Sequence, residues 1–158
     1  MENKSKPLKR VIVACIAFCA LFVAYISIQS WGTVEYLQEE FSGDLTARFA
    51  LIGVRYLLAL GLTATLLVFL ARIWQGASAG KLFIRGNHRW LYAMSALYFL
   101  YSMVDGNVGQ FIYKGFAETH IYLLYINEYM VVTCFVLVVF AKLYAIAVEV
   151  SEEQELTI

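Results

Sequence analysis

Three charged residues interrupt apolar stretches of the sequence and are the strongest candidates for chemistry. Arg55, Asp105 and Glu128 belong to three different stretches. If these stretches are helices that cross a membrane in alternating directions, the three side chains lie at a similar depth near the outer surface. We expect a structural cluster, because a guanidinium between two carboxylates neutralises charge that is costly inside a membrane. A proton- or ligand-binding site is the alternative, since ionisable residues in membrane helices often mark such sites.

No other pattern in the sequence indicates catalysis or a cofactor. There is no glycine-rich phosphate loop, no nucleophile motif and no basic pattern with interleaved aromatic residues. His88 and His120 belong to opposite ends of the expected helices, so they do not share a metal ion or a haem. Cys15, Cys19 and Cys134 all lie in apolar stretches, which favours packing between helices over redox chemistry. We therefore expect no enzyme activity, no catalytic residues, no metal, no cofactor and no direct binding of nucleic acid.

The elements that must position the three charges are membrane helices. Of the 158 residues, 61% are hydrophobic and 15% are charged, whereas a soluble domain has about half apolar and about a quarter charged residues. About 20 apolar residues suffice to cross the hydrocarbon core. We predict an all-α integral membrane four-helix bundle in a lipid bilayer, forming a single domain over 1–158. Its four spans are expected at about 11–31, 49–74, 89–110 and 120–148.

The third predicted span is the shortest apolar run. Its uncharged part, from Trp90 to Val104, covers only about 22 Å of helix before Asp105. It also carries a polar stripe at steps of three and four residues. Hydrogen bonds to neighbouring helices are the favoured interpretation of this stripe, and a small hydrated path is the alternative. The stripe comprises His88, Tyr92, Ser95, Tyr98, Ser102 and Asp105.

The distribution of lysine and arginine predicts the orientation of the helices. These residues concentrate in the first ten residues and in the connection between the second and third spans, whereas the connection over 32–47 is acidic. Cytoplasmic segments of membrane proteins carry the excess of lysine and arginine. We therefore expect a multi-pass protein with both termini in the cytoplasm, including an acidic cytoplasmic tail over 149–158.

Two short motifs support a resemblance to a known family. Gly80, Phe83, Asn87 and Leu91 fit a G-x-x-F-x-x-x-N-x-x-x-L pattern, and the chain ends in the acidic motif Glu-Gln-Glu-Leu-Thr-Ile. Both motifs resemble those of an uncharacterised bacterial family of four-span membrane proteins, a domain of unknown function. The resemblance implies a location in the bacterial cytoplasmic (inner) membrane. Such proteins are often encoded beside Xre-type helix-turn-helix regulators, which implies a cytoplasmic protein partner.

We accordingly expect a non-enzymatic membrane protein that binds or regulates a cytoplasmic partner, such as a transcriptional regulator, through its basic loop and acidic tail. Because loop and tail have opposite charge, binding to each other within one chain is an equal alternative. A different function class is a small proton-coupled transporter or ligand-binding protein that uses Arg55, Asp105 and Glu128. It would act as a homo-oligomer, because four short helices enclose little volume. The residues expected to bind a partner are Lys81, Phe83, Arg85, Asn87, Glu153, Glu155, Leu156 and Thr157.

Overall fold

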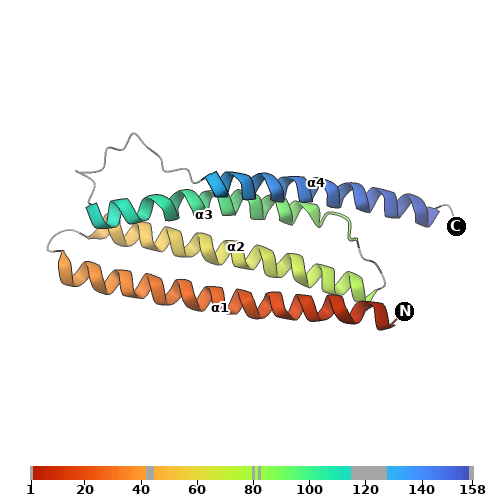
Figure 1. Ribbon diagram of the computed structural model, residues 1–158, viewed down its shortest axis with the longest axis horizontal. Helices are drawn as coiled ribbons and strands as arrows, with labels where there is room; N and C mark the ends of the chain where they lie inside the picture. The colour runs from red at the N-terminus through yellow and green to blue at the C-terminus, as the bar shows by residue number, and fades with distance from the viewer. Residues whose placement is uncertain (1, 42–44, 80, 82, 115–127, 157–158) are drawn as a thin grey trace.

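In the computed structural model, the described residues form four long α-helices (Figure 1). The structure describes residues 2–41, 45–79, 81, 83–114 and 128–156, with side chains described over 7–41, 45–79, 81, 83–108 and 129–154. Within those residues there is no β-strand, so the all-α prediction is confirmed. The helices are α1 (Glu2–Glu40), α2 (Thr46–Ser78), α3 (His88–Lys114) and α4 (Glu128–Leu156).

Three helices are long and apolar enough to cross a membrane. They are the segments Pro7–Glu40 of α1, Thr46–Ser78 of α2 and Tyr129–Gln154 of α4. Among the described residues, α3 does not reach the same combination of length and hydropathy. The physical reason is visible in the sequence, because Arg89 and Asp105 bracket its apolar run.

Helix α1 extends well beyond the predicted first span. Its 39 residues correspond to about 58 Å, whereas the hydrocarbon core is about 30 Å thick. Most of the connection expected over 32–47 is therefore helical, and α1 ends only at Glu40. Leu37 explains the extension, because its side chain is fully buried against Ile52 of α2 and Val108 of α3. Tertiary packing thus stabilises about two helical turns beyond Gly32.

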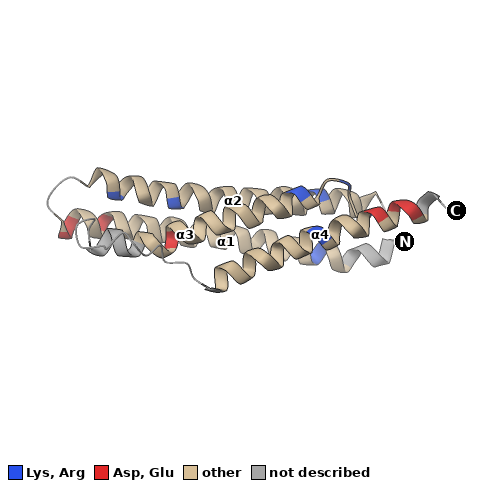
Figure 2. Ribbon diagram, turned by 90° about the horizontal axis from the view of Figure 1, so that it is seen from above, with Lys and Arg blue, Asp and Glu red and all other residues tan. Residues whose placement is uncertain are grey.

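The helices pack in the order of the sequence, α1 against α2, α2 against α3 and α3 against α4. Both chain termini lie at the same end of the molecule (Figure 1). We call this the proximal end, and the end that contains Glu40, Arg55 and Asp105 the distal end. Figure 2 shows that lysine, arginine, aspartate and glutamate of the described residues gather toward these two ends of the molecule, although Lys142 lies at the centre of α4 itself.

One apolar cluster lies at each end of the bundle. The distal cluster is the one around Leu37. The proximal cluster joins Leu91 and Met94 of α3 to Ala141 of α4, whose side chain is fully buried. A residue as small as Ala141 at this position allows α3 and α4 to approach closely.

Large apolar side chains cover the outer faces of α1 and α4. Phe18 and Leu21 of α1 are 68% and 69% exposed, and Phe135 of α4 is 68% exposed. A soluble monomer rarely exposes contiguous apolar surface on this scale, whereas a lipid bilayer covers it without cost. The exposed residues and the helix lengths together fit a transmembrane protein.

Candidate functional site

Arg55 and Asp105 form an ion pair that joins α2 to α3 at the distal end. The distance between Arg55 Nε and Asp105 Oδ1 is 2.5 Å, and the two side chains are 14% and 36% exposed. The register of antiparallel helices brings them together, because Arg55 lies in the third turn of α2 and Asp105 in the third turn from the end of α3. Pairing offsets the cost of removing each charge from water.

The guanidinium of Arg55 also reaches α1. Its Nη2 donates a hydrogen bond to Gln29 Oε1 at 3.0 Å, and Gln29 Nε2 donates to the hydroxyl of Tyr25 at 2.8 Å. Tyr101, one helical turn before Asp105, interacts electrostatically with both members of the ion pair. Arg55 is thus the centre of a polar network that spans three helices.

This network neutralises charge at the distal end. A guanidinium stays protonated in proteins and does not act as a general base. The carboxylate of Asp105 already has Arg55 as its counter-ion. The geometry therefore fits the structural role that the sequence favoured for these two residues.

Sequence reasoning brought Arg55 and Asp105 together but missed two members of the network. Gln29 lies between Ser27 and Ser30 near the end of the first apolar span, and Tyr101 lies four residues from Asp105 on the same helix face. Both residues are visible in the sequence, but the sequence alone did not indicate which residues they contact. The third expected member, Glu128, is the first residue of α4, and its side chain lies outside the described residues.

Two hydrogen bonds across the α3–α4 contact explain part of the polar stripe on α3. Ser95 Oγ donates to the carbonyl oxygen of Cys134 at 3.1 Å, and the Cys134 thiol lies 3.6 Å from the carbonyl oxygen of Ser95. Ser95 and Ser102 are both buried. For Ser95 the prediction of an interhelical hydrogen bond is confirmed.

At the proximal end, the connection between α2 and α3 is fastened to α4 through Tyr144. We call the described residues of this connection (79, 81 and 83–87) the proximal loop. The backbone N–H of Ile84 donates to the Tyr144 hydroxyl at 3.0 Å, and Asn87 Nδ2 lies 3.5 Å from the same oxygen. The ring of Phe83 contacts the ring of Tyr144 edge-on, with centroids 5.6 Å apart. The loop and α4 therefore form one unit.

The proximal loop also folds back onto the end of α2. The backbone N–H of Lys81 donates to the carbonyl oxygen of Gly76 at 2.8 Å. A Cβ atom at Gly76 would lie 2.7 Å from the Lys81 carbonyl oxygen and 2.6 Å from Ile84 Cδ1. Only glycine permits this close approach, so Gly76 fixes the path of the loop.

The described residues of the loop motif face the interior around Tyr144. Asn87 is fully buried and directly precedes α3, where its backbone carbonyl accepts the Trp90 N–H. Its side-chain amide turns to Tyr144 instead of capping the helix. Leu91 belongs to the apolar cluster against which Tyr144 packs. The spacing of the motif thus places an aromatic ring, an amide and a leucine around one side chain of α4.

The other residues expected to bind a partner lie around this unit. Lys81 and Arg85 are exposed, and Phe83 is 40% exposed despite its contact with Tyr144. Glu153 is exposed near the end of α4. The side chains of Glu155 and Leu156, and all of Thr157, lie outside the described residues.

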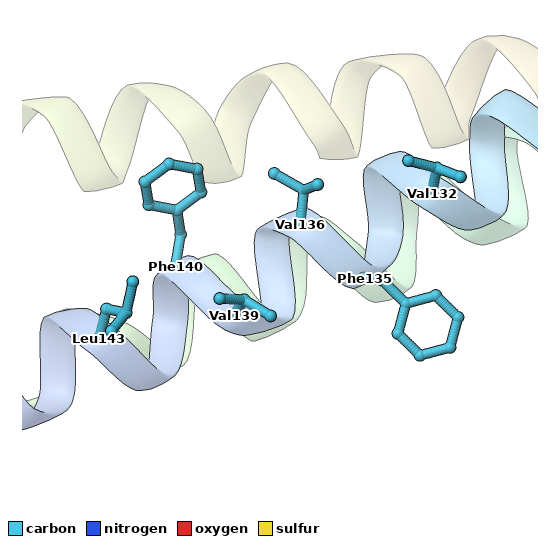
Figure 3. A pocket seen from close by; sticks show the side chains of 6 residues that line it. All are labelled: Val132, Phe135, Val136, Val139, Phe140 and Leu143. Atoms are coloured by element: carbon cyan, nitrogen blue, oxygen red, sulfur yellow. The ribbon is translucent and has the colours of Figure 1, made fainter.

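A hollow of about 430 Å³ separates the proximal loop from the end of α4. Its lining combines opposite charges with apolar groups: Lys81, Phe83 and Arg85 from the loop, and Val148, Ser151 and Glu152 from α4. A second hollow, of about 290 Å³, lies on α4 and is lined only by apolar side chains (Figure 3). In Figure 3 Phe135 points away from the α2 ribbon that runs above α4, and the side chains that line the hollow provide no hydrogen-bond donor or acceptor.

Comparison with known proteins identifies no relative from which a function could be inferred. No family model, curated protein or solved structure matches this chain.

Proposed function

We propose that this chain is a non-enzymatic integral membrane protein that binds a cytoplasmic protein partner at its proximal end. The observation that carries the proposal is the attachment of the proximal loop to α4 through Tyr144. It makes a basic loop and an acidic helix end into one preformed surface, which we call the proximal platform (the proximal loop with Val148–Gln154). A preformed surface binds a partner at a lower entropic cost than two separate flexible segments.

The composition of the proximal platform supports binding of a protein. Phe83 is an aromatic side chain held in place by Tyr144 yet 40% exposed, and Arg85 lies beside it at the same hollow. Aromatic and arginine side chains are enriched among the residues that dominate binding energy. Glu152 adds negative charge on the opposite wall. A partner with an apolar anchor and charges of both signs complements this surface.

The proposal includes an orientation and a location. We place the proximal end in the cytoplasm, because the amino-terminal segment and the basic loop carry most of the lysine and arginine, as cytoplasmic segments of membrane proteins do. The resemblance of the loop and tail motifs favours a multi-pass protein of the bacterial inner membrane. It also favours a transcriptional regulator as the partner.

The competing function, transport through the distal charges, requires groups that change charge or partner during a cycle. Arg55 is held by both Asp105 and Gln29, which supports a static role for it. We therefore place the function at the proximal end.

The proposal is tested by comparing the proteins that copurify from native membranes after crosslinking. The variants are a deletion of 152–158 and the substitution Phe83→Ala, with Arg48→Gln at the distal end as the control. We expect the same protein to be lost with both proximal variants and retained with Arg48→Gln. A set of copurifying proteins that is unchanged by both proximal variants refutes the proposal.

A further inference from the structure

A third hollow at the proximal end is lined by three arginines. It has a volume of about 620 Å³ and lies between α2, the proximal loop and the first turns of α3. It is separate from the hollow beside α4, and Arg85 lines both. Its lining residues are Arg72, Arg85, Gly86, Arg89, Trp90 and Ala93.

The three guanidinium groups concentrate positive charge around this hollow. In the part of the structure with described side chains, no carboxylate pairs with Arg72, Arg85 or Arg89. Arg72 is half-buried, so its charge is less well solvated than those of the other two. Three positive charges around one hollow repel each other unless an anion lies between them. The hollow is therefore suited to a ligand with concentrated negative charge.

The backbone around the hollow is held in place. Gly86 has a φ of +79°, a conformation that favours glycine, and its carbonyl accepts the Arg89 N–H at 3.2 Å. This turn leads directly into α3, whose first turn adds the positive end of a helix dipole. On the far side of the turn, buried Asn87 anchors the loop to Tyr144. The backbone that carries Arg85 and Arg89 is therefore held in a defined position.

The hollow lies at the level expected for lipid headgroups. Arg55 and Arg72 are about 25 Å apart along α2, with only uncharged residues between them. This separation approaches the thickness of the hydrocarbon core, which puts Arg72 near its boundary. Trp90 in the lining is an aromatic residue of the type enriched at that boundary.

We propose that Arg72, Arg85 and Arg89 bind the phosphate of an anionic membrane lipid. Arginine suits this ligand, because its planar fork donates two parallel hydrogen bonds to phosphate oxygens. Basic hollows between membrane helices at the level of the headgroups are known to take such lipids. The acyl chains of the lipid lie along the apolar part of α2 and α3, beside Ala93. Arg85 is shared with the proximal platform, whereas Arg72 and Arg89 line only the arginine-lined hollow, so substitutions at these two positions test the lipid separately from the protein partner.

The test measures which lipid stays bound to the purified full-length protein. The protein is reconstituted in nanodiscs with equal amounts of phosphatidylglycerol and phosphatidylcholine, released into detergent, and examined by native mass spectrometry. We expect phosphatidylglycerol to be retained in preference to phosphatidylcholine. In Arg72→Gln/Arg89→Gln this preference should fall about tenfold, as two charge-assisted contacts are lost. Equal retention of the two lipids by the unmodified protein overturns the proposal.

Two further experiments distinguish lipid binding at this hollow from non-specific attraction to surface charge and from binding of free phosphate. Arg10→Gln removes an exposed positive charge at the same end but outside the hollow, so it should leave the preference unchanged. An equal loss with Arg10→Gln overturns the proposal in favour of surface charge. Release of the retained lipid by inorganic phosphate or glycerol phosphate overturns the assignment to a lipid. Thermal unfolding in detergent verifies that the double variant is folded. Arg72→Lys keeps the positive charge but lacks the planar guanidinium, so it should lose only part of the preference for phosphatidylglycerol.

Discussion

The hydroxyl of Tyr144 accepts a hydrogen bond from the backbone N–H of Ile84, a residue 60 positions earlier in the chain, at 3.0 Å. This bond joins the connection between α2 and α3 to a helix that begins 44 residues after Ile84. The ring of the same tyrosine packs between Phe69 of α2 and Phe83 of the loop. One side chain of α4 therefore fixes the position of the proximal loop.

We expect Tyr144→Phe to loosen the proximal loop without unfolding the helices. The substitution keeps the ring contacts but leaves the Ile84 N–H without its acceptor, which costs about 1–3 kcal/mol. Hydrogen–deuterium exchange should show faster exchange of the Ile84 amide. Tyr92→Phe is a matched control, because Tyr92 contacts His88 through its ring and is 39% exposed. Slow exchange at Ile84 in Tyr144→Phe would show that the hydrogen bond is dispensable.

The ion pair at the distal end should show energetic coupling. We expect Arg55→Gln and Asp105→Asn each to lower the free energy of unfolding by about 1–3 kcal/mol, which is less than for a fully buried pair because Asp105 is 36% exposed. The double variant should lose less than the sum of the two single variants, since it leaves no unpaired charge. Unfolding in mixed detergent micelles measures all three values. Strictly additive losses would mean that the ion pair does not stabilise the α2–α3 contact.

A methyl group at position 76 should destabilise the protein. In Gly76→Ala the added carbon meets the Lys81 carbonyl oxygen at 2.7 Å, and backbone at that distance must shift, which costs about 1–3 kcal/mol. Gly53→Ala is the matched control on the same helix, because no atom lies within 4 Å of its added carbon. There the higher helix propensity of alanine should raise stability by up to about 1 kcal/mol. If the unfolding temperature shifted in the same direction for both variants, this description of the loop would be wrong.

The hydrogen bond of Ser95 to α4 should make a small contribution. We expect Ser95→Ala to lower the free energy of unfolding by about 0.6 kcal/mol, the average for hydrogen bonds between membrane helices. Thr133→Ala on the exposed side of α4 is the control, since its hydroxyl bonds only within its own helix, to the Tyr129 carbonyl oxygen. The same unfolding measurement compares the two. A loss no larger than that of Thr133→Ala would assign the α3–α4 contact to packing alone.

Periodicity and charge were sufficient to predict an all-α molecule and to place Arg55 and Asp105 at one depth. Both follow from helix geometry and from the alternating direction of successive helices. The role of Tyr144 was not predictable in this way, because a tyrosine in an apolar helix is typical of many environments. Its importance depends on where a loop 60 residues away folds back, which Gly76 and Gly86 decide. The length of α1 was also missed, because it depends on the burial of Leu37 by other helices.

The spacing of Arg55 and Arg72 on α2 has a consequence for the membranes that suit this protein. About 25 Å of uncharged helix separates them, and both ends are held, Arg55 by its ion pair and Arg72 at the arginine-lined hollow. When the surrounding bilayer is thicker than this apolar length, tilting cannot relieve the mismatch, because a tilted helix spans an even smaller depth. Insertion of the protein should therefore be less favourable in thick, sterol-rich membranes, and bilayers of short-chain lipids should accommodate it best.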